Sequence, residues 1–454
     1  MEKLPAEKIQ NNSESFFIIP FYYSGKKVFE KCVSDNWSKD KSYNHWFLAK
    51  HIDAFDKGEE DERIFTYYTL KTDAYQSYGL PNPNQEIKIT SDLIVDDNNI
   101  MPEEFTMKIY QIKLLYFSTG FGFLIYKIDH RDDGIETIIN KSFALLRAFV
   151  PNRKSGKQVR FHAQISSENN SGDVTEEEIN IINITNKLLE LKGKKNKVEL
   201  FPISCKNQCY VYHRIQLAEP MSDEDVKSAL LYLRKGFHRT FIIYEEEENS
   251  ICDFIWRQNK NLYWGGSMKG LVSLSYCLPG ENNYFVTNQY INNVRYQYFL
   301  LYMILLHQRQ VLLHYNYLAV KEQNDMKKLE QIKKELIRFR INFAYKTVSD
   351  EASYQKLYDG MYECLSLDSL NSDIQDVIDR VTEYQDLSKE KGINKALALI
   401  AMFSIFSAFA DGLALVDRLM AEPKLTCFHW TTVISIIFII IIAGYIFIKN
   451  IFKK

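Results

Sequence analysis

The sequence predicts an α+β cytosolic domain, followed by long stalk helices and a C-terminal hairpin of two transmembrane helices. Up to residue 287, short aromatic and β-branched runs alternate with amphipathic helical patterns, whereas every later segment has a helical pattern. Between Leu425 and Ile448 there is no charged side chain, and a helix of about 20 apolar residues spans a bilayer core of roughly 30 Å. We therefore expect a sensor body at 1–287, a stalk at 288–394 and the hairpin at 395–454.

The composition limits the class of protein and its compartment. The 454 residues carry a net charge of −2, which argues against a general nucleic-acid binder, since such proteins need a basic face. The seven cysteines are scattered and odd in number, so a reducing cytosol is favoured over a disulfide framework. Residues 1–15 lack the apolar core of a signal peptide, so we expect the body to stay cytoplasmic.

The body contains local signals for strands. Phe16–Tyr23 reads as a buried strand, and Lys108–Asp129 as a hairpin whose aromatic, β-branched arms flank Ser118-Thr119-Gly120. The polar run 164–174 marks a candidate subdomain seam. Further strands are expected within 92–99, 240–244, 251–256 and 271–278.

Two helices of the body are predicted from their ends. Thr175 and Glu178 have the spacing of a capping box, which predicts a helix that begins there and ends at Lys192-Gly193. Ser222 is a good N-cap ahead of three acidic residues, and it predicts a second helix that ends near Lys235-Gly236.

Helical patterns continue from the body toward the membrane. Tyr298–Val320 is apolar but holds Arg309, and a charge at the bilayer centre costs about 3 kcal/mol or more, so a buried soluble helix is favoured over a span. Further along, one apolar stripe is formed by Met326, Leu329, Leu336, Phe339 and Phe343. A heptad seam that runs into the first span follows, formed by Leu370, Ile374, Val377, Val381 and Tyr384.

The first span is expected over the uncharged run Ala396–Ala410. Positive residues favour the cytoplasmic side. Six flank the two runs outside the hairpin (Lys389, Lys391, Lys395, Lys449, Lys453 and Lys454), and only Arg418 and Lys424 lie between them. This bias predicts a multi-pass protein of the cell (inner) membrane, with both termini cytoplasmic and about 417–428 outside. The alternative is a single tail anchor, with the first run a buried or interfacial helix.

This layout, over about 290–454, resembles the CorA-like family of membrane proteins. The segments LYFSTGFGFLIYKI and YFLLYMILLHQRQVLL are also similar to segments of uncharacterised bacterial CorA-like proteins. The resemblance implies a homo-oligomer, a pentamer, whose first span lines a pore. The magnesium transporters of the family carry Gly-Met-Asn at the end of that span, but the stretch here reads ADGLALVDRLMAEPK, which puts magnesium transport in doubt. Other CorA-like proteins are effectors of type III CRISPR defence, which implies a nucleotide messenger built from S-adenosylmethionine and AMP (SAM-AMP) as ligand.

Two groups of residues in the body are candidates for binding such a ligand. Arg234, Lys235, His238 and Arg239 lie between a helix end and a strand, where they could hold an anion. The alternative is that they only complement the helix dipole. The second group is Gly265, Gly266 and Lys269, whose backbone N–H groups and charge could cradle phosphate, although a plain hairpin turn is the alternative.

Other residues are candidates for buried or pore positions. His307 and Arg309 could be a core pair or a buried ligand contact. Asp411 and Asp417 could form acidic rings of a cation pore in an oligomer, or Asp411 could be a stop at the membrane interface.

No catalytic or metal-binding constellation is evident, so we expect no enzyme activity and no metal site. Cys205 and Cys209 have no second pair, so zinc is not expected. The first functional hypothesis is an oligomeric membrane channel or effector gated by a nucleotide messenger bound to the body, with the lipid bilayer and other copies of the chain as partners and no direct nucleic-acid contact. The alternatives are a divalent-cation transporter, and a non-conducting membrane-anchored scaffold.

Overall fold

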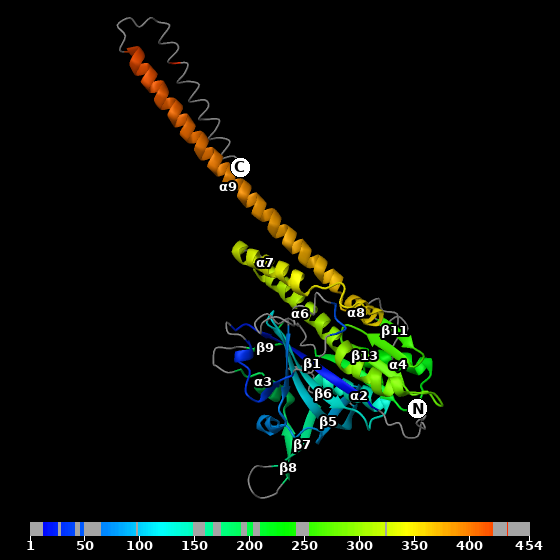
Figure 1. Cartoon of the computed structure of the whole chain (residues 1–454). Helices are drawn as coiled ribbons and strands as arrows, with labels where there is room; N and C mark the ends of the chain where they lie inside the picture. Colours follow the sequence, from blue (N-terminus) through cyan, green and yellow to red (C-terminus); the bar gives the residue numbers. More distant parts are fainter. Residues whose placement is uncertain are drawn as a thin grey trace. The chain divides into compact units, whose positions relative to one another are not determined.

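The computed structural model describes most of the chain up to residue 420, namely residues 12–25, 29–40, 46–49, 65–96, 99–148, 159–166, 174–191, 198–202, 209–241, 254–322, 325–420 and 434. The chain forms two compact units, residues 1–375 and 376–454. The first unit is mostly β-structure with helices on both faces, and the C-terminal part is helical (Figure 1).

The described part of the first unit is built on a 13-stranded sheet with the main order β11-β12-β13-β10-β1-β6-β5-β4-β7-β8. Every pairing is antiparallel except that of β10 with β13, which is parallel. The strands are β1 (Glu14–Tyr23), β2 (Trp37–Lys39), β3 (Phe65–Leu70), β4 (Glu86–Asp96), β5 (Asn99–Phe117), β6 (Phe121–Asp129), β7 (Val159–Ser166), β8 (Val174–Ile179), β9 (Val198–Leu200), β10 (Tyr210–Leu217), β11 (Phe254–Asn259), β12 (Leu262–Gly266) and β13 (Gly270–Tyr276).

The predicted central hairpin is confirmed. β5 and β6 pair from Lys108↔Asp129 to Tyr116↔Gly122, and β1 adds to the other edge of β6. Gly120 closes the turn with φ +95°, and a Cβ there would lie 2.9 Å from the Tyr22 ring. Only glycine enters this region without strain, which explains its place between two aromatic strands.

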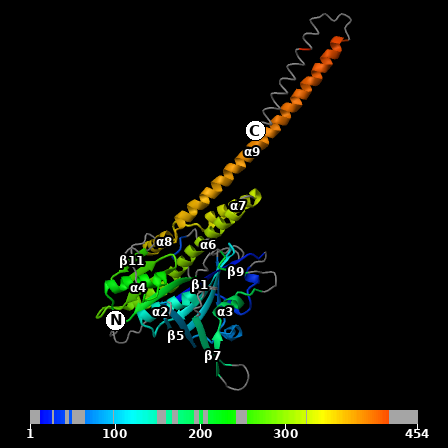
Figure 2. The same cartoon turned by 180° about the vertical axis from the view of Figure 1, so that it is seen from behind.

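One face of the sheet is covered by three helices, α2 (Ile135–Ala148), α3 (Ile181–Leu188) and α4 (Asp223–Lys235). The prediction for α4 is confirmed at both ends, because Ser222 accepts a hydrogen bond from the Asp225 N–H and Gly236 is left-handed at φ +63°. Figure 2 shows α2 and α4 lying side by side, and they bury Ile138, Ile139, Leu230 and Leu233 with residues of β10 and β13.

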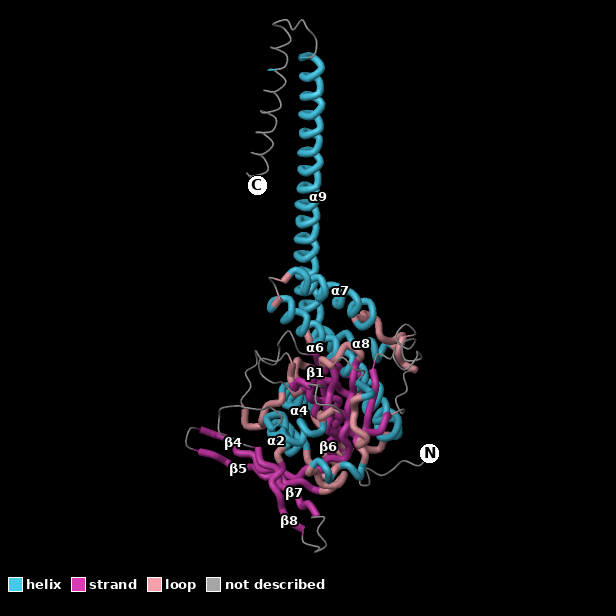
Figure 3. Tube along the Cα trace, turned by 90° about the vertical axis from the view of Figure 1, so that its left-hand side faces the viewer, coloured by secondary structure: helices cyan, strands magenta, loops and turns pink. Residues whose placement is uncertain are grey.

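The predicted capping box at Thr175 and Glu178 is wrong. Both residues lie in β8, which pairs with β7 from Phe161↔Ile179 to Ser166↔Val174. The helix that follows, α3, begins one residue after Asn180, whose side chain accepts from the Asn183 N–H. Pairing with β7 thus overrides the local capping signal. At the β8 end of the sheet, strands β4, β5, β7 and β8 extend beyond the helices, as Figure 3 shows.

The other face of the sheet is covered by helices from the segment after residue 284. Two π-helical turns, η6 (Phe285–Tyr290) and η7 (Asn293–Tyr298), lead into α6 (Phe299–Lys321). The prediction of a buried soluble helix at 298–320 is confirmed, because α6 packs through Phe299 on Phe16 and through His307 on Phe117. α7 (Met326–Phe343) and α8 (Ala352–Cys364) follow, and single-turn 3₁₀ helices occur at η2 (Phe29–Lys31), η4 (Thr72–Ala74) and η5 (Gln76–Tyr78).

The last described helix, α9, runs from Leu367 to Met420. Within it, Leu367–Gly412 is long and apolar enough to cross a membrane, judged by length and composition. Of the predicted heptad seam, Ile374 and Val381 are buried and Tyr384 is exposed. The second predicted span lies outside the described residues except for Ile434. Cys205 also lies outside them, and so does the part of the expected strand 240–244 that follows Phe241.

Candidate functional site

The fold brings the two predicted ligand-binding groups together at the C-terminal end of α4. The Ser267 hydroxyl, in the β12–β13 turn, donates to the Arg234 carbonyl at 2.6 Å. The Lys269 ammonium lies 5.5 Å from the centre of the Phe237 ring. Residues that are 32 and 33 positions apart in the sequence therefore share one edge of the sheet.

Within this edge, however, the basic side chains are held by protein groups. His238 is buried, and its Nε2 lies 3.1 Å from both carboxylate oxygens of Glu103. Arg239 is exposed, stacks at 5.0 Å on the Tyr232 ring and lies 3.7 Å from the Glu136 carboxylate. Arg234 is buried in the last turn of α4 and Lys235 is half-buried beside it. These contacts engage His238 and Arg239 with protein carboxylates and an aromatic ring, and complementing the helix dipole stays the alternative to ligand binding.

The two glycines of the second group lie in β12, not in the turn. A side chain at Gly265 would meet Leu230 of α4, and one at Gly266 would collide with Met361 of α8. The turn itself is closed by a hydrogen bond from the Ser267 N–H to the Gly270 carbonyl, and the Lys269 N–H donates to the Ser267 hydroxyl. The glycines thus permit close helix packing on both faces, and the turn uses its own donors.

The two pore candidates both belong to α9. Asp411 is exposed one residue beyond the apolar run Ala396–Ala410. Asp417 was expected in a loop, but helix α9 continues through it to Met420, so that detail is wrong. Helix α9 therefore continues beyond the apolar run, through residues 411–420.

A different and more tightly built constellation surrounds Glu14, at the first position of β1. Its Oε1 accepts from Arg214 Nε at 2.7 Å and from Arg295 Nε at 2.8 Å. Its Oε2 accepts from Arg295 Nη2 at 3.2 Å and from the Tyr110 hydroxyl. Lys127, opposite Phe16 on the next strand, completes what we call the Glu14 cluster (Glu14, Tyr110, Lys127, Arg214 and Arg295).

The electrostatics of the Glu14 cluster follow from its burial. Burial raises the pKa of Glu14, but the charges of Arg214 and Arg295 and the hydrogen bond from Arg295 outweigh it and lower that pKa to about 2. Lys127 is 1% exposed, and burial together with the charge of Lys113 lowers its pKa well below the usual value. The pKa of both groups is thus lowered, which favours the charged carboxylate of Glu14 but disfavours the charged form of Lys127.

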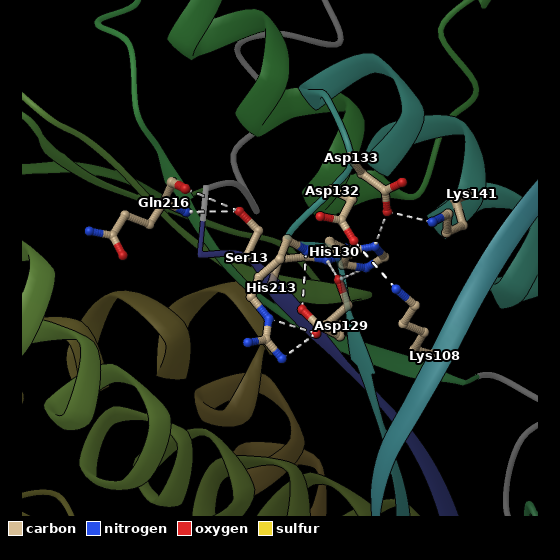
Figure 4. A network of polar contacts seen from close by, with 11 residues as sticks. Ser13, Lys108, Asp129, His130, Asp132, Asp133, Lys141, His213 and Gln216 are labelled. Atoms are coloured by element: carbon tan, nitrogen blue, oxygen red, sulfur yellow. Dashed lines mark hydrogen bonds and ion pairs between the residues drawn. The ribbon is translucent and has the colours of Figure 1, made fainter. Parts of the chain in front are cut away.

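A second polar network lies on the opposite face of the sheet, at the next residue of β1, and is shown in Figure 4. His130 Nε2 lies 2.9 Å from the Ser15 hydroxyl, and its Nδ1 lies 2.9 Å from an Asp133 oxygen, which also accepts from Lys141. The Ser15 hydroxyl lies 2.6 Å from His213 Nδ1 as well. Burial lowers the pKa of both histidines, that of His213 to about 3, so both rings are neutral.

The Ser15–His130–Asp133 order has the geometry of a nucleophile, a base and an orienting carboxylate. Ser15 is 0% exposed, however, and its hydroxyl already lies between two imidazole rings. Held between these rings, its Oγ is not free to attack an acyl or phosphoryl substrate. The network therefore fastens β1, β10 and the β6–α2 connection, and this arrangement gives no support to a hydrolase.

A surface cavity of about 510 Å³ lies next to this network, between the β6–α2 connection and residues 217–221. Its three charged members, Arg131, Asp132 and Glu219, are exposed, and Arg131 and Asp132 pair with Asp129 and Lys108. Among the described residues there is no group of acidic, histidine and cysteine side chains that could hold a metal ion, and Cys32, Cys209, Cys277 and Cys364 are buried.

Sequence reasoning missed both networks because their members lie on separate strands. Glu14 contacts Arg214 and Arg295, which are 200 and 281 positions away. A signal did exist, since Glu14, Lys127 and His213-Arg214 each interrupt an otherwise apolar strand, and a charge in a buried strand requires a partner.

Comparisons of this chain with protein-family models, with curated proteins and with solved structures find no match.

Proposed function

We propose that this chain is a membrane-anchored, ligand-responsive effector of the CorA-like kind. It would act as a homo-oligomer, a pentamer, in which a small nucleotide messenger such as SAM-AMP binds the body and opens or distorts a pore of two spans per subunit. The observation that carries the proposal is that the apolar run of α9 is exposed and belongs to one helix with residues of the first unit.

The apolar run of α9 has the properties that a bilayer requires. Ile393, Leu397, Ile400, Met402 and Phe403 are all exposed, with Phe403 72% exposed. Water-exposed apolar side chains around a whole helix are stable only when lipid or other protein covers them. Lysines at 389, 391 and 395 precede the run and Asp411 follows it, as at the boundary of a span.

The test is leakage from liposomes that contain the full-length protein and an enclosed dye. We expect release on addition of SAM-AMP and none with AMP or ATP at the same concentration. A chain that stays silent with the messenger, or leaks equally with all three nucleotides, would contradict gating by such a ligand. Silence together with a monomer in detergent would favour the scaffold alternative.

Asp411 also favours a second candidate, a divalent-cation transporter. A carboxylate beside a span, repeated around an oligomer, attracts cations. Rescue of a magnesium-uptake defect by the chain, lost in Asp411→Asn, would support this function over the effector.

A further inference from the structure

The Glu14 cluster contains more buried cationic donors than the protein's own acceptors satisfy. Lys127 makes no hydrogen bond or ion pair within the described part of the chain, and its ammonium lies 4.3 Å from the centre of the Phe16 ring. Arg214 Nη1 is also buried without an acceptor in those residues. Isolated buried cations are strongly unfavourable unless an anion pairs with them.

The nearby carboxylates do not meet this need. Glu14 already accepts from Arg214, Arg295 and Tyr110, and Asp40 pairs with Lys113 at 2.8 Å. Four basic side chains therefore surround two carboxylates on this face of the sheet. One further negative group would satisfy the donors that remain.

We propose that the Glu14 cluster is a binding site for a phosphate-bearing small anion, and that the Glu14 carboxylate occupies it in the ligand-free protein as an internal competitor. Arginine and lysine donors at this density match the several acceptor oxygens of a phosphate group. A carboxylate held by two guanidinium groups imitates such a group with two oxygens and one charge.

The position of Glu14 makes the exchange feasible. Glu14 is the first residue of β1, so it can withdraw without breaking the interior of the strand. Arg295 is 29% exposed and lies on η7, one of two successive π-helical turns, so it forms the outer wall. π-Helical turns are rare and frequently occur at functional sites.

The wall of the site is continuous with the helices that lead to α9. η7 passes directly into α6, from which Gln308 donates to the Phe343 carbonyl and Arg309 to the Leu365 carbonyl, two residues before α9 begins. Release of Arg295 from Glu14 would thus act on the helix that contacts the start of α9. This part of the inference rests on the proposed function, whereas the anion site does not.

The test is thermal unfolding of the full-length protein in detergent with inorganic pyrophosphate, at an ionic strength held constant with KCl. A ligand that binds only the folded state raises Tm with concentration. We expect a rise for the native chain, at least a tenfold loss of apparent affinity in Lys127→Met, and no loss in Lys108→Met, a half-exposed lysine on β5 that pairs with Glu86 and Asp132. Lys127→Met keeps the side-chain length and removes a buried amino group for which the described residues supply no hydrogen-bond acceptor, so it is expected to fold.

Calorimetry in buffers of different ionisation enthalpy supplies a second readout. Burial lowers the pKa of Lys127 in the free protein and a bound anion would raise it, so binding by the native chain should take up more protons than binding by Lys127→Met. Absence of a pyrophosphate effect, or an equal effect in Lys127→Met, would overturn the site. Binding without messenger-triggered leakage would instead keep the site and contradict the proposed effector.

Discussion

At the scale of single residues, alternation along β1 creates two chemistries at one place. Glu14 points to the face covered by η7 and α6, while Ser15 points to the face covered by α2. The facing pair on β10, Arg214 and His213, alternates in the same way, since Glu14 lies opposite Arg214 and Ser15 opposite His213. One ladder of backbone hydrogen bonds thus positions the Glu14 cluster on one side of the sheet and the network of Ser15, His130 and His213 on the other.

A buried histidine makes the free energy of unfolding depend on pH, and His307 can be used to measure this dependence. Its Nε2 lies 2.7 Å from the Thr119 hydroxyl, its ring stacks on Phe117 at 3.8 Å, and burial lowers its pKa to about 3. Because the folded pKa lies below the unfolded value of about 6.5, its contribution to stability is complete above pH 6.5 and is lost as pH falls toward 3. We expect a loss of about 2 kcal/mol at pH 5 relative to pH 8 from this residue.

The measurement is the free energy of unfolding by denaturant at several pH values. His307→Gln should be less stable at pH 8, since it loses the ring contacts, but its stability should fall less steeply between pH 6.5 and pH 5. A pH slope unchanged by the substitution would show that His307 is not a neutral buried group.

At the scale of elements, local signals predicted the structure wherever the determinants lie within a few residues. The β5–β6 hairpin and both ends of α4 could be read from their turn and cap residues. Thr175 and Glu178 misled because pairing with β7, set by tertiary contacts, outweighs a capping box. The Glu14 cluster and the Ser15 network could not be predicted, because strand order decides which polar residues meet, and a single sequence does not fix that order.

The β5–β6 turn gives a prediction for an element. Gly120→Ala should destabilise the protein by about 1–3 kcal/mol, because alanine is strained at φ +95° and its Cβ would press on the Tyr22 ring and the Tyr23 carbonyl. Gly79→Ala is the matched control, since its φ is +76° and nothing lies within 4 Å of the added Cβ. Denaturant unfolding should rank Gly120→Ala as clearly the more destabilised, and equal losses would mean that the contacts at Tyr22 and Tyr23 do not matter.

At the scale of the whole molecule, helix α9 has a polar first part and an apolar second part. The buried residues of the first unit form apolar clusters on the sheet, whereas six large apolar residues of α9 beyond residue 392 are exposed, namely Ile393, Leu397, Leu399, Ile400, Met402 and Phe403. The change occurs after the lysines at 389, 391 and 395, where the sequence predicted the start of a span. A bilayer around the second half of α9 would explain this composition, and the proposal of an anchored effector depends on that environment.

Two substitutions in α9 test the bilayer directly. Phe403→Lys places a charge in the apolar run, at a cost of about 3 kcal/mol in a membrane, while Tyr384→Lys makes the same kind of change in the polar part of the helix. Phe403 and Tyr384 are 72% and 54% exposed, so neither substitution disturbs a packed core. After alkaline carbonate extraction of membranes, we expect Phe403→Lys to be partly released and Tyr384→Lys to stay in the pellet with the native chain. If both variants were retained equally, the run at Ala396–Ala410 would not be in contact with lipid, and conduction through it would have no physical basis.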